Sequence, residues 1–299
     1  MDYTIISNYL NYCKTHKRLS THTLRAYKND LMQFYNSNNE CVVSYIEGLT
    51  HSNLKTSTLR RKIASLKVFY SYLQSKNDIT DNPFDQLQFQ FRAEKTLPKT
   101  IPHDSLKILY TYLQKKIISA KTIYQKQKAE RNLLIVSLLL STGIRISELC
   151  HIQIKDINLT EQTLQILGKG KKERMIFIGD ERTFQLLKAY ITCYCNHTDD
   201  YLFPGKSLQK PLTEQSVRLL LKTAKTQTRL TTTITPHMFR HSFATMLLDN
   251  DVDIRQIQHL LGHSNINVTQ IYTHVSQSKQ VEILSEHNPL NQITPLLRT

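Results

Sequence analysis

The sequence predicts a mainly α-helical, two-domain protein whose second domain is α+β and holds a small β-sheet or hairpin. Three observations favour this fold class. Apolar residues recur at helical spacing through the first ninety or so residues. Prolines interrupt that pattern between residues 76 and 103. Beyond the interruption, two short β-prone runs flank a glycine-containing basic segment, GKGKKE, which is typical of a hairpin.

Residues 1–90 are expected to form a helical domain. Apolar side chains at intervals of three and four residues predict four helices, at residues 2–16, 24–34, 42–49 and 59–73. The fourth helix also carries the positive side chains of Arg60, Arg61, Lys62 and Lys67, and no acidic residue occurs between His51 and Asn77. Such a charge run is usually a solvated helix face, but it also suits contacts with phosphate groups.

Residues 91–103 are expected to link the two domains. The wider stretch 76–103 contains Pro83, Pro98 and Pro102 and little sustained apolar pattern. Proline suppresses helix and stiffens the chain, as a hinge requires. A surface loop within one large domain is the alternative interpretation.

Residues 104–299 are expected to form the second domain, which begins with helices. Residues 133–140 form an apolar run that predicts a buried helix and is too short to cross a bilayer. Gly143 is expected to end that helix, and Arg145 stands where the next one begins. Glu148 is three residues further on and is placed to orient Arg145 by hydrogen bonding. Arg145 could also be an ordinary surface residue in a salt bridge.

The predicted hairpin places lysines at its turn. Residues 163–167 and 174–178 are the two β-prone runs, and a helix is expected at residues 213–222. A lysine in such a turn can simply be flexible and exposed. The candidates for phosphate contact in this region are Lys169, Lys171, Lys172, Arg174, Arg218 and Lys222.

Residues 235–275 gather polar side chains that suit chemistry. Thr235 and Pro236 are typical of a helix start, and the next helix carries His237, Arg240 and His241 on one face because they are spaced i, i+3 and i+4. A second helix is expected to stop at Gly262, with His263 in the following turn and Tyr272 on a third short helix. Taken singly, a histidine or tyrosine is more often a packed, hydrogen-bonded residue. Their combination is unlikely to be accidental.

These motifs resemble those of the tyrosine recombinase family. H-x-x-R-H, then L-G-H, then a tyrosine are similar to the family's second arginine motif and nucleophile, and LLGHSNINVTQIYTHV is especially similar to Xer-type and transposon-type members. G-I-R-I-S-E-L is similar to the first arginine motif, and G-K-G to the turn that holds the family's catalytic lysine. The first domain resembles the helical, SAM-like core-binding domain, although it has no diagnostic motif.

The resemblance implies six catalytic residues: Arg145, Lys169, His237, Arg240, His263 and Tyr272. Two arginines offer planar, permanently charged groups that match a phosphate. Tyr272 would be the nucleophile and would form a covalent link to the DNA 3′-phosphate, which keeps the bond energy for rejoining. His237 would act as base or hydrogen-bond partner, Lys169 would protonate the leaving 5′-oxygen, and His263 would hold a phosphate oxygen. No cofactor and no metal is expected.

The composition favours a nucleic-acid partner. The net charge is +15 with a pI near 9.5, which suits a polyanion. Double-stranded DNA with paired recombination half-sites is expected, held by a two-domain clamp. The resemblance adds a homo- or hetero-tetramer on DNA, assembled by exchange of the C-terminal tail. An anionic membrane is the competing partner, but neither end of the chain carries a basic amphipathic helix or lipidation signal.

The N-terminus lacks the basic start of a secretion signal, so a cytoplasmic location is expected. The five cysteines are odd in number and form no C-x-x-C pair, which favours free thiols and no structural zinc.

Three other functions are compatible with parts of the sequence. A type IB topoisomerase uses a similar set of residues, but typically has lysine where this chain has His237. A metal-dependent nuclease would need carboxylates near the histidines, whereas Asp249, Asp251 and Asp253 are expected to cap or follow a helix. A non-catalytic DNA-binding protein would give no reason for the Tyr272 motif. Within the recombinase interpretation, resolution of chromosome or plasmid dimers and integration or resolution of mobile elements both remain open.

Overall fold

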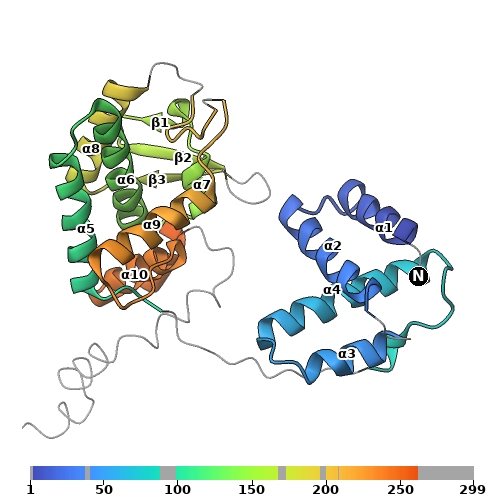
Figure 1. Ribbon diagram of the computed structural model, residues 1–299. Coiled ribbons are helices and arrows are strands. Elements are labelled where there is room, and N and C mark those ends of the chain that lie inside the picture. Colours follow the sequence, from blue (N-terminus) through green and yellow to red (C-terminus); the bar gives the residue numbers. More distant parts are fainter. Residues whose placement is uncertain are drawn as a thin grey trace, which may run out of the picture. The chain divides into compact units, whose positions relative to one another are not determined.

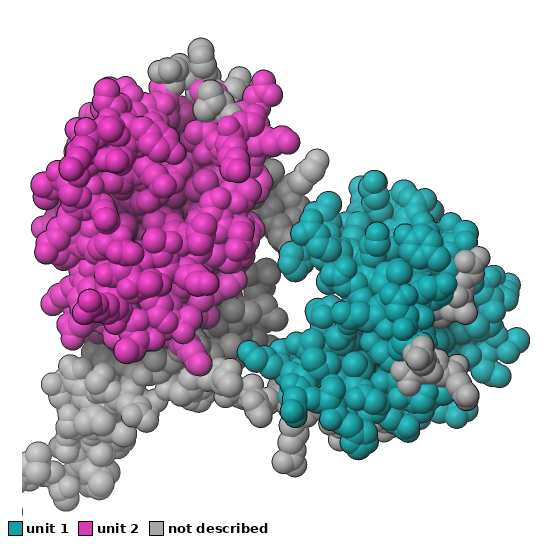
Figure 2. All heavy atoms as spheres, in the orientation of Figure 1, with its two compact units in different colours: residues 1–95 teal, residues 96–299 magenta. Residues whose placement is uncertain are grey.

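The chain folds into two compact units, residues 1–95 and 96–299 (Figure 2). The computed structural model describes residues 3–37, 41–87, 99–167, 173–195, 200–207 and 209–261. These residues are mostly helical and include one small antiparallel sheet, so the predicted fold class is confirmed (Figure 1). Within these ranges, no helix combines the length and the apolar character needed to cross a lipid bilayer.

The described part of the first unit contains four α-helices, as predicted. They are α1 (Tyr3–Thr15), α2 (Thr21–Tyr35), α3 (Val42–Thr50) and α4 (Thr56–Ser75). The Ser20 side chain accepts a hydrogen bond from the Thr23 backbone N–H and thereby caps α2. The helices bury one apolar core, whose fully enclosed members include Ile6, Tyr9, Leu31, Leu66 and Phe69.

The proline-containing stretch begins inside this unit. Asn82 accepts a hydrogen bond from the Phe84 N–H and starts a 3₁₀ turn, η1 (Pro83–Asp85). The turn directs Phe84 into the core beside Tyr70. Pro83–Asp85 therefore belongs to the first unit, although proline interrupts the helical pattern there. One buried aromatic ring is enough to attach a segment that has no repeating apolar pattern.

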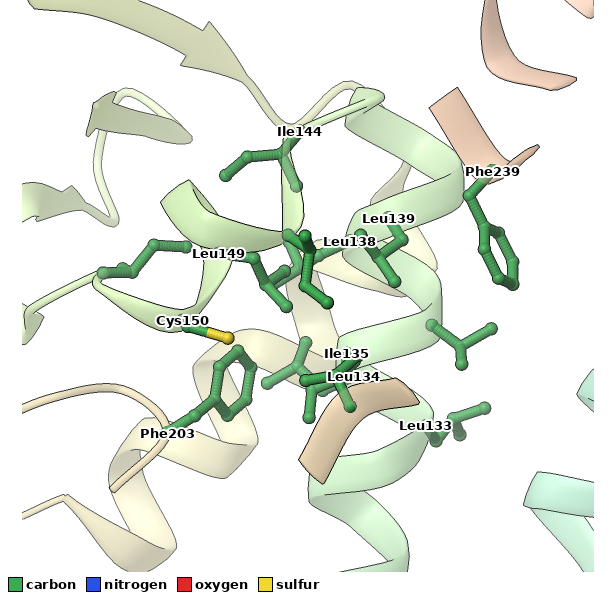
Figure 3. Close-up of a cluster of buried hydrophobic side chains, with 14 of the residues drawn as sticks. Leu133, Leu134, Ile135, Leu138, Leu139, Ile144, Leu149, Cys150, Phe203 and Phe239 are labelled. Atoms are coloured by element: carbon green, nitrogen blue, oxygen red, sulfur yellow. The ribbon is translucent and has the colours of Figure 1, made fainter. Parts of the chain in front are cut away.

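The second unit is organised around a long buried helix, α6 (Ile123–Thr142). Three helices pack against it: α5 (His103–Ile118), α8 (Glu181–Tyr194) and α10 (Pro236–Asp249). The apolar run predicted to be buried is indeed enclosed, from Leu133 to Leu139, and Figure 3 shows these side chains beside Leu149, Cys150, Phe203 and Phe239. Helix α9 (Glu214–Thr228) packs against α5.

The three-stranded sheet has the order β1 (Ile157–Asn158), β2 (Thr163–Leu167), β3 (Glu173–Phe177), with both pairs antiparallel. The predicted hairpin is confirmed, since Thr163 pairs with Phe177 and Leu167 with Glu173. Successive side chains of β3 alternate, so Ile176 is buried while Met175 and Phe177 are exposed.

Strand β1 and helix α8 of this unit were missed in the sequence. Strand β1 has only two residues and no pattern of its own. Helix α8 did leave a signal: Asp180 caps it by accepting a hydrogen bond from the Thr183 N–H, and Phe184, Leu187 and Tyr190 are buried at helical spacing.

The chain enters the second unit through a contact with α10. Ile101 is buried, and its backbone N–H donates a 2.8 Å hydrogen bond to the Ser242 Oγ. The first residues of this unit are therefore attached to the helix that carries His237, Arg240 and His241.

Candidate active site

The segment before Arg145 needs a glycine. Gly143 ends α6 in the left-handed conformation, with φ of 60°. A Cβ atom there would lie 2.6 Å from Phe243 Cδ1 and 2.8 Å from Leu261 Cδ2. Only glycine allows both the turn and this close approach. The turn places Arg145 at the N-cap of α7 (Ile146–Cys150), as predicted.

Glu148 orients Arg145, which confirms the prediction from their spacing. Glu148 Oε2 accepts a 3.0 Å hydrogen bond from the Arg145 backbone N–H, and Oε1 accepts a 2.8 Å bond from Arg145 Nη1. The Arg145 side chain remains 37% exposed, so part of its guanidinium can still meet a ligand.

Arg174 of β3 approaches the same carboxylate from the sheet. Its Nη1 and Nη2 donate hydrogen bonds of 2.8 Å each to Glu148 Oε1 and Oε2. Burial by itself would raise the pKa of Glu148, but the hydrogen bonds and charge of Arg174, followed by the hydrogen bonds of Arg145, hold it below its usual range. Glu148 is therefore a buried, ionised acceptor between two arginines. The sequence assigned Arg174 to phosphate contact, and the alternation along β3 was the available signal that its side chain points inward.

Arg240 is buried, with 6% of its surface exposed, and connects three segments. From α10, its Nη1 donates a 2.8 Å hydrogen bond to the Gly143 carbonyl and its Nη2 a 2.7 Å bond to the Leu261 carbonyl. Gly143 lies two residues before Arg145, and Leu261 ends α11 (Ile254–Leu261), two residues before His263. The structure thus brings together the segments that carry the two arginine motifs.

The two histidines of α10 differ in environment. His237 is exposed and follows Pro236 in the first turn, where Thr235 caps the helix as predicted. His241 is half-buried, and burial, followed by the charges of His237 and Arg240, lowers its pKa below the ordinary 6.5. His237 is therefore the histidine of this pair that is open to a ligand.

Lys169, Lys171, Lys172, His263 and Tyr272 lie outside the described residues, so the roles expected of them remain predictions.

The residues expected to contact DNA fall into two groups. Arg60, Lys67, Arg218 and Lys222 are exposed on their helices, and Arg218 also pairs with Glu214. Arg61 and Lys62 instead form ion pairs with the buried Asp30, and the side chain of Lys62 is only 8% exposed. Lys62 also donates to Gln33, so its ammonium faces the interior of the first unit. This placement differs from the charged helix face that the sequence predicted.

All five cysteines are free, as the sequence suggested they would be. Across the described ranges, no group of three or more His, Cys, Asp or Glu side chains is placed to hold a metal ion. The histidines of α10 are accompanied by arginine, which suits an anion better than a cation.

Comparison with known proteins places this fold and this site in one family. Residues 99–279 match the phage integrase family, and residues 6–77 match the phage integrase N-terminal SAM-like domain. The chain belongs to the phage integrase family. It is a Xer-like tyrosine recombinase, an enzyme of site-specific recombination that cuts and rejoins DNA, so the resemblance seen in the motifs is confirmed.

Two relatives match almost over their whole length. A tyrosine recombinase of Agathobacter rectalis is 47% identical, with 96% of each chain covered. Tyrosine recombinase XerC of Staphylococcus haemolyticus is 33% identical, with 94% of this chain and 95% of the relative covered. The fold is also that of the XerH site-specific recombinase bound to a palindromic difH substrate, with a TM-score of 0.71 at 24% identity over 94% of this chain and 84% of that one. These relatives favour neither a topoisomerase-like activity nor a non-catalytic DNA-binding protein.

Proposed function

We propose that Tyr272 cuts one DNA strand through a covalent 3′-phosphotyrosine intermediate, assisted by Arg145, Lys169, His237, Arg240 and His263. The observation that carries this proposal is the hydrogen bond from Arg240 to Gly143, because it joins the α10 motif to the segment that presents Arg145. Two guanidinium groups on adjoining segments suit the binding of one phosphodiester.

The reaction is a phosphoryl transfer. The Tyr272 phenol oxygen forms a bond to phosphorus while the bond from phosphorus to the 5′-oxygen breaks. His237 accepts the phenol proton, and Lys169 gives a proton to the leaving oxygen. A 5′-hydroxyl from a partner strand then attacks the phosphotyrosine and reverses the steps. The number of bonds is unchanged, so no nucleotide cofactor is needed.

The arginines stabilise the charge that develops on the non-bridging oxygens. Their donors are held in advance, Arg145 by Glu148 and Arg240 by two backbone carbonyls. Preorganised donors of this kind contribute roughly 10²–10³ in rate each. His263 adds a further donor to the same phosphate.

Both units contribute to DNA binding. A net charge of +15 supplies affinity for the phosphate backbone that does not depend on sequence. The first unit offers Arg60 and Lys67, and the second offers Arg218 and Lys222. Together the units act as a clamp around duplex DNA, with the chain ahead of Ile101 as the connection.

The test uses the DNA that the purified protein selects from fragments of its host's replicons. A duplex of that sequence, nicked beside the cleavage position, traps the intermediate because the short cut strand diffuses away. Wild type should form a covalent adduct and Tyr272→Phe none, with unchanged DNA affinity. Tyr124→Phe is the matched control, because Tyr124 is an exposed tyrosine at the start of α6. An adduct with Tyr272→Phe would show that Tyr272 is not the nucleophile. Cleavage abolished by EDTA would favour a metal-dependent nuclease.

A tetramer assembles on two paired recombination sites by exchange of C-terminal tails. The tail sequence NPLNQITPLLRT has apolar residues but few charges, which suits docking on a neighbouring subunit. Deletion of residues 285–299 should abolish the synaptic complex in a gel-shift assay while binding to one site persists. Normal assembly by the truncated protein would rule this out.

The biological role follows from the selected DNA. Binding at one chromosomal site would indicate dimer resolution, whereas binding at the ends of a mobile element would indicate integration or transposition. Either role places the enzyme in the cytoplasm, with the DNA.

A further inference from the structure

Arg174 has an inward-facing side chain on a strand that otherwise alternates in the usual way. Glu173, Met175 and Phe177 are exposed, while Arg174 and Ile176 point to the covered face of the sheet. The Arg174 side chain is 16% exposed. Its Nε is also buried, with no hydrogen-bond partner among the residues that the structure describes. The guanidinium of Arg174 is thus largely withdrawn from the surface.

Both terminal nitrogens of Arg174 bind the Glu148 carboxylate, at 2.8 Å each. This paired geometry is the strongest that an arginine and a carboxylate can form. Glu148 in turn accepts two hydrogen bonds from Arg145, one from the backbone and one from the guanidinium. The contacts therefore run from Arg174 on β3, through the Glu148 carboxylate, to Arg145. Of these three side chains, that of Arg145 is the most exposed.

We infer that Arg174 is a positioning residue for strand cleavage: it touches no DNA, but fixes Glu148 and, through Glu148, the guanidinium of Arg145. This inference rests on the proposed function, because it assigns Arg145 to the scissile phosphate. It differs from the sequence-based expectation that Arg174 contacts a phosphate itself.

Removing Arg174 should act through the charge of Glu148. Among the residues that the structure describes, the charged groups that face this carboxylate are Arg174 from β3 and Arg145 from the start of α7. Without Arg174, burial is opposed by Arg145 alone, so the pKa of Glu148 rises towards the working pH. A protonated Glu148 no longer attracts Arg145 as an ion, and the arginine loses its fixed direction.

The test separates binding from cleavage on the same nicked duplex, with full-length protein at saturating concentration. Arg174→Gln should leave the dissociation constant within about twofold and lower the single-turnover cleavage rate by roughly tenfold to 100-fold, the range for outer partners of functional side chains. The acid limb of its pH–rate profile should move to higher pH. Arg174→Lys keeps the charge without the paired geometry, so its cleavage rate should lie between those of wild type and Arg174→Gln.

Lys222→Gln is the matched comparison, because Lys222 is an exposed candidate for phosphate contact. It should weaken binding, as the loss of a direct phosphate contact does. If Arg174→Gln behaves like Lys222→Gln and mainly weakens binding, Arg174 contacts DNA directly and the inference is wrong. The inference is also wrong if Arg174→Gln changes neither the cleavage rate nor the acid limb of the pH–rate profile. Absence of adduct with wild type would instead overturn the proposed function.

A further pair of variants tests whether a lower cleavage rate merely reflects loss of folding. Glu148→Met combined with Arg174→Met replaces a buried ion pair by apolar side chains of similar length, an exchange that proteins often tolerate. The double variant should unfold at about the wild-type temperature and still cleave at least tenfold more slowly. Its rate should match that of Glu148→Met alone, because both act through Arg145. A double variant that folds and cleaves at the wild-type rate contradicts the inference.

Discussion

Arg240 Nη1 donates a 2.8 Å hydrogen bond to the carbonyl of Gly143, so the second arginine of the site is attached to the turn that presents the first. The same guanidinium reaches the Leu261 carbonyl at the end of α11. A planar guanidinium has several N–H donors, so it can donate to two carbonyls from different segments at once. It also carries a permanent positive charge.

Arg240→Lys should therefore lose more than a phosphate contact. A lysine ammonium cannot match both carbonyl directions, so one buried acceptor is left without its donor, at a cost of about 1–3 kcal/mol in the free energy of unfolding. Cleavage of the nicked duplex should fall by at least about 100-fold. Arg182→Lys, an exposed arginine on α8, is the control and should change neither value. Wild-type cleavage by Arg240→Lys would remove Arg240 from the active site.

Gly143→Ala should destabilise the second unit. The methyl group would meet Phe243 and Leu261 at less than 3.0 Å, and the backbone would hold alanine at a φ of 60°. Left-handed backbone costs about 1–2 kcal/mol and overpacking about 1–3 kcal/mol, so a loss of roughly 2–5 kcal/mol is expected in chemical denaturation.

Gly48→Ala provides the comparison for Gly143→Ala, since Gly48 lies within α3 and its added Cβ would meet nothing within 4 Å. That change should stabilise the first unit by about 0.5–1 kcal/mol. Equal effects at the two glycines would show that the tight packing at Gly143 has no energetic weight.

Lys62 and Lys67 lie on the same helix but should respond differently to substitution. Lys67→Gln removes an exposed charge and should reduce the slope of log affinity against log salt concentration by about 1, with stability unchanged. Lys62→Gln breaks a buried contact with Asp30 and should cost roughly 2–4 kcal/mol of unfolding free energy, with the salt slope unchanged. Salt titrations of DNA binding and urea unfolding of both variants decide the matter. A lower slope for Lys62→Gln would restore it as a phosphate contact.

His241 should make the second unit sensitive to mild acid. Its pKa in the folded protein lies below the ordinary 6.5 because of burial and of the charges of His237 and Arg240. The unfolded chain therefore binds a proton at this histidine more readily than the folded protein does. The contribution of neutral His241 to the free energy of unfolding is complete above about pH 6.5 and is lost as the pH falls towards the folded pKa.

The unfolding temperature should decrease between about pH 7 and pH 5.5 in wild type, and less so in His241→Asn. NMR titration of the imidazole protons gives the pKa directly. The exposed His22 is the control, because His22→Asn should leave the pH dependence as it is in wild type. A folded pKa for His241 at or above 6.5 would contradict the proposed environment.

Local signals predicted the parts of the site that lie close together in the sequence. Gly143 ends a helix, Thr235 and Pro236 begin one, and Glu148 lies one turn from Arg145, so short-range geometry settles each of these features. The hairpin followed from two alternating runs with a basic turn between them.

Contacts between distant segments could not be predicted in the same way. Arg174 looked like its basic neighbours, and only the packing of β3 against α7 shows that it faces Glu148. Lys62 belonged to an unbroken positive run, and its contact with Asp30 depends on how α2 and α4 cross. Phe84 was one apolar residue among prolines, and its burial depends on the core of the first unit.

The hydrogen bond between Ile101 and Ser242 connects the chain ahead of α5 directly to α10, in addition to the covalent link into α5 itself. A pull on the chain at Ile101 therefore acts on α5 through the backbone and on α10, the helix of His237 and Arg240, through this hydrogen bond.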